Sequence, residues 1–216
     1  DLFKPPYRKL LEEKNRLIDN YRHTAETLKA ADLKLLHDDI DATKKEAVAV
    51  LNELLRDDFE HLGVKFEQAT WDDKKGAEGK LKKRQITADD IEAQRPFHWG
   101  YEFDEIMQGN GGFDAIITNP PWEGFKPQAK EFFSEYSGLV TKNKMALSDF
   151  EKEQSKLLKN SELRAAWLEY LSRFPHMNTF YRTASQYGHQ VAYAAGKKIV
   201  TDLNLYKLFL EQCYNL

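Results

Sequence analysis

The chain has 216 residues, of which 41% are hydrophobic and 31% charged, so it can build a packed core with a helical extension and is too apolar for wholesale disorder. Its net charge of −3 excludes a strongly basic protein, and any contact with nucleic acid must come from local patches. The chain has a single cysteine, Cys213, so it cannot form an internal disulfide. Its six histidines do not have the spacing of metal ligands. No apolar run is long enough to span a bilayer. We therefore expect a cytoplasmic protein that binds no metal and no membrane.

Two amphipathic patterns occupy the first part of the chain. Apolar side chains recur at steps of three and four over residues 7–28 and again over residues 44–62, which predicts two antiparallel helices. The segment 30–43 between them is predicted to be partly helical. Residues 1–68 are therefore expected to form a helical hairpin or insertion, a structure that can serve purely as a scaffold.

Residues 69–96 have no clear periodicity and concentrate charge, which predicts a surface loop followed by a short helix capped by Thr87. The basic residues of this segment are predicted to be solvated, with contacts to phosphate groups as the alternative; they are Lys74, Lys75, Lys80, Lys82, Lys83 and Arg84. One group of residues is similar to the two carboxylates and lysine of metal-dependent nucleases: Asp72 or Asp73, together with Glu78 and Lys80. Glycines interrupt that set and no strand pattern surrounds it, which favours the loop.

A short apolar run over residues 113–118 follows a glycine-rich segment, 109–112. The glycines predict a turn rather than a phosphate cradle, because they precede a strand pattern instead of opening a helix. The run is nearly continuous in apolar character, which favours a strand buried on both faces. It ends at residues 119–122, Asn-Pro-Pro-Trp, since proline cannot continue a central strand.

Helical patterns dominate the rest of the chain. They cover residues 128–136, then 148–171 as one or two helices stopped by Pro175, then 178–187 and 202–214. The chain as a whole is therefore predicted to be mainly α, with one or few short strands.

The Asn-Pro-Pro-Trp motif suits the binding of a purine turned out of its base stack. The side-chain oxygen of Asn119 and the carbonyl of Pro120 can accept both hydrogens of an exocyclic amine, which leaves the nitrogen lone pair free for attack. The proline rings fix the backbone and so hold that carbonyl in place. Trp122 offers a stacking face, and Phe125 is expected to line the same pocket.

The residues from Phe97-His98-Trp99 through Glu102-Phe103 to the run 112–122 resemble the catalytic motif region of gamma-class adenine-N6 DNA methyltransferases. Specifically, they resemble the large gamma-class enzymes of bacterial type IIG restriction–modification and related phage-defence systems. The resemblance implies that Asn119, Pro120, Pro121 and Trp122 bind the target adenine. It also implies S-adenosyl-L-methionine as cofactor and double-stranded DNA with a flipped adenine as partner.

The same resemblance sets the expected organisation. Residues 97–216 are expected to be part of an α/β Rossmann-like methyltransferase domain, with a motif strand 113–118, a loop 119–125 and then helices. Residues 203–211 resemble the family's helix before the next strand of the sheet. The segment 69–96 forms the charged loop and short helix between this part and the helical insertion 1–68.

One departure from the family concerns the cofactor. No glycine-containing cofactor loop precedes Asn119, so the main binding loop is absent from this chain and its cofactor-binding residues are unknown. We expect a fragment of a longer polypeptide that is inactive without the remainder of its parent protein.

Two other interpretations stay open. The chain can be a non-catalytic helical interaction module in which the Asn-Pro-Pro-Trp turn is incidental. It can also belong to an enzyme that methylates another amine, cytosine N4 or a protein glutamine. His98 is interpreted as a core histidine rather than a general base, since this methylation needs no strong base.

Overall fold

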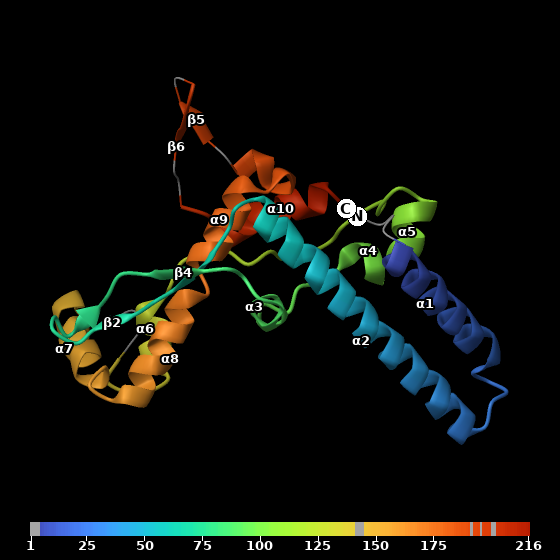
Figure 1. Ribbon diagram of the computed structural model, residues 1–216, viewed down its shortest axis with the longest axis horizontal. Coiled ribbons are helices and arrows are strands. Elements are labelled where there is room, and N and C mark those ends of the chain that lie inside the picture. The colour runs from blue at the N-terminus through green and yellow to red at the C-terminus, as the bar shows by residue number, and fades with distance from the viewer. Residues whose placement is uncertain (1–4, 141–144, 191, 195, 200–201) are drawn as a thin grey trace. The chain divides into compact units, whose positions relative to one another are not determined.

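The computed structural model describes residues 5–140, 145–190, 192–194, 196–199 and 202–216, which are mainly helical with a few short strands (Figure 1). The prediction of a mainly α chain is thereby confirmed. The chain divides into two compact units: Asp1–His61 with Ile86–Ile117 and Leu216, and Leu62–Gln85 with Thr118–Asn215. Among the described residues, no helix combines the length and apolar character that crossing a membrane requires.

The first unit is built on the helices α1 (Pro5–Thr24) and α2 (Ala30–His61), which lie side by side (Figure 1). Their contact surface includes the buried side chains of Tyr7, Leu11 and Ala47. Residues 30–43, predicted to be only partly helical, are helical throughout. The reason is that no proline or glycine interrupts this stretch and its aspartates remain on the exposed side of the helix.

Three short helices complete the first unit: α3 (Ala88–Ala93), α4 (Trp99–Glu102) and α5 (Asp104–Gly109). The predicted cap at Thr87 is confirmed as a capping box, in which the Thr87 hydroxyl accepts from the Asp90 amide at 3.3 Å and the Thr87 amide donates to the Asp90 carboxylate at 2.8 Å. The predicted turn after Gly109 is also present. Gly112 has a φ of +138°, and a Cβ atom there would lie 2.3 Å from the Leu216 carbonyl oxygen.

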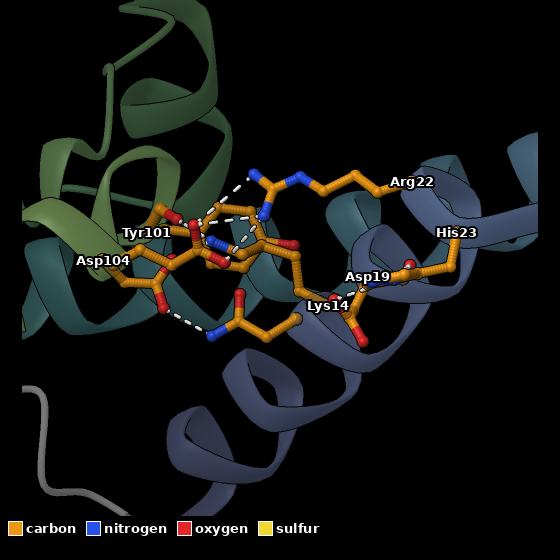
Figure 2. A network of polar contacts seen from close by, with 8 residues as sticks. Lys14, Asp19, Arg22, His23, Tyr101 and Asp104 are labelled. Atoms are coloured by element: carbon orange, nitrogen blue, oxygen red, sulfur yellow. Dashed lines mark hydrogen bonds and ion pairs between the residues drawn. The ribbon is translucent and has the colours of Figure 1, made fainter.

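A buried polar network joins α1 to α4 and α5. The ammonium group of Lys14 forms an ion pair with Asp104 and donates to the Tyr101 carbonyl, and Asn15 donates to Asp104 at 2.6 Å (Figure 2). Burial is the main cause that raises the pKa of Tyr101 to about 12. Because both charges of the Lys14–Asp104 pair are taken out of water, each depends on the other.

The second unit contains a long hairpin and a helical core. In the hairpin, β1 (Phe66–Gln68) pairs with β4 (Lys82–Arg84), and β2 (Trp71–Asp72) pairs with β3 (Ala77–Glu78), all antiparallel. The core lies among α6 (Ala129–Ser134), α7 (Leu147–Leu157) and α8 (Ser161–Ser172). Its buried side chains are Phe133, Val140, Phe150, Leu158, Leu163 and Trp167.

The hairpin corrects the prediction of an irregular loop at the start of residues 69–96. Its strands are short and individually weak, and contacts distant in the sequence stabilise them. The Ala69 amide donates to the Ser172 hydroxyl at 2.9 Å, and Trp71 packs against the helical core. Such contacts leave no periodic signal in the sequence.

The remaining elements are α9 (Pro175–Thr183), the 3₁₀ segment η1 (Ser185–Gln190), the hairpin of β5 (Ala192–Ala194) with β6 (Lys197–Ile199), and α10 (Leu205–Tyr214). The segment 148–171, predicted as one or two helices, forms two, which are divided where Asn160 caps α8. Pro175 begins α9, because the first turn of a helix tolerates a residue without an amide hydrogen.

The segment 113–118 is not a strand, so the prediction of a strand buried on both faces is wrong for this chain. Ile116 is 39% exposed and Ile117 is 99% exposed, and the backbone has no regular structure there. A strand needs a neighbour to satisfy its amides and carbonyls; among the described residues no strand pairs with this segment, and only the Phe113 amide has a backbone partner, the Leu216 carbonyl at 3.1 Å.

Candidate functional site

The Asn-Pro-Pro-Trp motif lies in the second unit, in an exposed loop that precedes α6. The Asn119 side-chain oxygen accepts a hydrogen bond from the Trp122 indole nitrogen at 3.3 Å. Trp122 is 69% exposed, and Asn119 is exposed as well. A bond of this length between exposed groups exchanges readily with another donor, so the Asn119 oxygen can accept from an incoming amine.

The loop is fastened to the beginning of α10 through its backbone. The Leu205 amide donates to the Glu123 carbonyl at 2.9 Å, and the Phe125 amide donates to the Leu203 carbonyl at 2.8 Å. Between them, Gly124 and Asn204 form an antiparallel bridge. Residues 123–125 are therefore held against 203–205, although the two segments are about eighty residues apart in the sequence.

The indole of Trp122 rests against a second aromatic ring at the start of α10. The ring centres of Trp122 and Tyr206 are 5.5 Å apart and their planes are tilted by 32°. The ammonium group of Lys207 lies 5.9 Å from the Tyr206 ring centre. Because Trp122 is supported by Tyr206 and still largely exposed, it can stack on a further planar group.

Phe125 lies in a different aromatic cluster from Trp122. Its ring centre is 5.3 Å from that of Phe174 and 5.4 Å from that of Tyr181. Burial raises the pKa of Tyr181 to about 12, with a smaller contribution from Tyr187. Among the described residues, the ring partners of Phe125 do not include Trp122, and its role in substrate binding stays a prediction.

The aromatic residues before the motif form their own cluster in the first unit. Trp99 contacts Phe97 at 4.8 Å and Phe103 at 5.7 Å between ring centres, and Phe103 contacts Phe113 at 5.1 Å. His98 does not take part in this stack. Its ring nitrogen Nε2 lies 2.8 Å from the Asn52 side-chain oxygen, and burial lowers its pKa below the usual value.

Two of the carboxylates that are similar to those of metal-dependent nucleases, Asp72 and Glu78, form hydrogen bonds within the fold. Asp72 accepts the Lys74 and Lys75 amides at 3.1 and 3.3 Å in the hairpin turn. Glu78 accepts from the Trp167 indole nitrogen at 2.8 Å. Within the part of the chain that the structure describes, no three potential metal ligands cluster.

The sequence predicts that the motif residues 119–122 bind the target base, and it separately indicates a family-like helix over residues 203–211. The sequence does not predict that these two segments are in contact, or that Tyr206 packs against Trp122. No periodicity or motif encodes that contact. The one available signal is that Tyr206 is an aromatic residue at the start of a segment that shares the family resemblance.

Comparison with known proteins places the chain in a family. The family model described as Eco57I restriction-modification methylase matches residues 21–164, two thirds of the chain, and this range contains the whole motif loop. Searches of curated proteins and of solved structures found no match. A restriction–modification methyltransferase is thereby supported in general terms, and DNA is the substrate that this family implies. The chain belongs to the Eco57I restriction-modification methylase family.

Proposed function

We propose that this chain is part of an S-adenosyl-L-methionine-dependent DNA methyltransferase that methylates adenine N6 in a restriction–modification or phage-defence system. The observation that carries the proposal is the exposed pair of Asn119 and Trp122 on a loop fastened to α10, inside the region that matches the family. Exposure leaves both side chains accessible to substrate, and the backbone bonds restrict their movement.

The geometry supports a specific set of roles. The Asn119 oxygen and the Pro120 carbonyl accept the two hydrogens of the adenine amine, which turns the nitrogen lone pair outward. Trp122 stacks on the flipped base, which is worth about 1–3 kcal/mol and offsets part of the cost of unstacking. The amine proton leaves after methyl transfer, so no strong base is needed, in agreement with a His98 that is held by Asn52 and whose pKa is lowered by burial.

The cofactor supplies an electrophilic methyl group, but no residue of this chain is assigned to hold it. The glycine-rich turn 109–112 does not fit such a role, because the Leu216 carbonyl occupies the space beside Gly112 and accepts a hydrogen bond from the Phe113 amide. The 216-residue chain alone is therefore expected to transfer no methyl group. Saturable micromolar cofactor binding by calorimetry would contradict this expectation.

The test is transfer of a labelled methyl group to DNA by the full-length protein that contains this chain. In the wild type, we expect the label in N6-methyladenine, and we expect Asn119→Ala to lose at least about a hundredfold in rate, as when other preorganised polar groups are removed from active sites. Asn110→Ala, an exposed asparagine in the turn after α5, is the matched control and should retain activity.

Each other outcome has a defined meaning. Label in cytosine N4 or in protein would contradict the adenine assignment. A folded wild type that transfers nothing to varied DNA would favour the non-catalytic interaction module instead.

A further inference from the structure

The hairpin in the second unit, residues 65–84, carries a local positive charge in a chain that is negative overall. We refer to it as the basic hairpin. It contains seven basic and four acidic side chains, whereas the whole chain has a net charge of −3. All three residues of β4, Lys82, Lys83 and Arg84, are exposed.

Most of the acidic side chains of the basic hairpin are engaged locally. Glu67 pairs with Lys83 at 3.2 Å, Asp72 accepts amides in the turn, and Glu78 accepts from Trp167. By contrast, Lys74, Lys80 and Lys82 are exposed and have no carboxylate oxygen within 4 Å among the described residues. The excess positive charge is therefore presented to solvent.

Tertiary contacts join the basic hairpin to α8. Its outgoing strand is bonded to α8 through the Ala69 amide and the Ser172 hydroxyl, and its returning strand through Glu78 and Trp167. The guanidinium of Arg84 stacks over the Phe66 ring, 4.0 Å from its centre. A charged segment with this many tertiary contacts loses little conformational entropy when it binds a partner.

The cations of β4 form a short row. Lys82 and Arg84 are alternate residues of β4, so they share one face of the strand and lie about 6.8 Å apart. The phosphate groups of DNA also form a regular row of charges, so a row of exposed cations on one face of a strand can contact several of them.

The basic hairpin and the motif loop belong to the same compact unit. A cavity of about 260 Å³ is lined by Thr70 and Gly79 from the hairpin, by Pro127 just after the motif loop, and by Phe174. Phe174 also contacts Phe125 of the motif loop, at 5.3 Å between ring centres. The basic hairpin and the motif loop are therefore connected within one unit through this cavity and through Phe174.

We infer that the basic hairpin is a contact surface for the phosphate backbone of double-stranded DNA. The inference rests on the proposed function, since it takes DNA as the substrate. The hairpin lysines bind without reading sequence: they neutralise phosphates, release counterions and position the duplex.

The experiment measures how binding depends on salt. A fluorescein-labelled, random-sequence DNA duplex is titrated with the 216-residue chain by fluorescence anisotropy, over salt concentrations from about 50 to about 200 mM. The test variant carries Lys74→Gln, Lys80→Gln and Lys82→Gln. The control variant carries Lys9→Gln, Lys34→Gln and Lys45→Gln, which removes the same charge from exposed positions on α1 and α2. Circular dichroism checks that both variants fold.

Each phosphate contact contributes about 0.9 to the slope of log affinity against log salt, so we expect the test variant to lower that slope by about 2.7. The control variant should change it by much less. Equal changes in the two variants would overturn the inference, because they would reflect overall charge alone.

Two further outcomes would also overturn it. A wild-type chain that does not bind duplex DNA at low salt has no such surface, whereas the proposed methyl transfer is decided separately by the Asn119→Ala assay. Tighter binding of an RNA duplex than of DNA would assign the surface to a different nucleic acid.

Discussion

The Lys14–Asp104 network and the motif loop use polar groups in opposite ways. Lys14 and Asp104 have side chains only 8% and 4% exposed, and they satisfy each other within the first unit. Asn119 and Trp122 are exposed, and their mutual hydrogen bond is long. The buried Lys14–Asp104 pair therefore stabilises the fold, whereas the exposed Asn119–Trp122 pair remains available to a ligand.

This contrast separates stability from activity. Substitutions in the network should change the free energy of unfolding, and substitutions around the motif loop should change methyl transfer with little effect on stability.

Lys14→Met should lower the free energy of unfolding by about 3–5 kcal/mol, because it leaves the Asp104 carboxylate buried without its cation. Urea unfolding of the chain measures the change. The exposed pair of Arg22 and Glu105, 3.3 Å apart, gives the matched control: Arg22→Met should cost at most about 1 kcal/mol. Adding Asp104→Leu to Lys14→Met should recover much of the loss, and no recovery would contradict a charge-based explanation.

Tyr206→Leu should lower kcat/KM for DNA methylation by about 2- to 10-fold, because an aromatic pair contributes about 0.5–1.5 kcal/mol beyond its buried area. Tyr206→Phe keeps the ring beside Trp122 and should restore activity. The full-length protein is assayed, and unfolding curves of both variants are compared. If leucine and phenylalanine behave alike, Tyr206 acts only as a packing residue.

His98→Gln should remove a small pH dependence of stability. Burial lowers the pKa of folded His98 below its ordinary value of 6.5, so the unfolded chain takes up a proton first as pH falls. The stability contributed by neutral His98 is fully present at pH values above 6.5. It is lost as the pH falls from 6.5 through the lower pKa of folded His98. The difference in unfolding free energy between wild type and variant should shrink over that window. A constant difference would show that His98 titrates normally.

Much of the helical structure could be predicted because its signals are local. The apolar spacing of residues 7–28 and 44–62 corresponds to α1 and α2, and Thr87 before two aspartates corresponds to a capping box. The prediction of a strand over residues 113–118 was wrong because a strand does not depend on local signals alone. Its apolar pattern is genuine, but pairing requires a neighbouring strand, and pattern alone cannot supply one.

The division of the chain shows the same limit. The segments 1–68, 69–96 and 97–216 follow composition along the sequence, and as a statement about domains they stay a prediction. The compact units are discontinuous, because the hairpin at 62–85 packs with residues beyond 118. Contacts of that kind depend on Ser172 and Trp167, which lie about a hundred residues away from their partners.

The sequence by itself determined the helical character of this protein, its family resemblance and the identity of the motif residues. Helix periodicity, capping and a rare tetrapeptide are all short-range properties of the chain. Only the tertiary structure decided that the loop 119–125 meets 203–206, that Tyr206 supports Trp122, and that the charged segment is a fixed hairpin. These features depend on side chains that become neighbours when hydrophobic burial brings distant segments together, and no local pattern records which ones will meet.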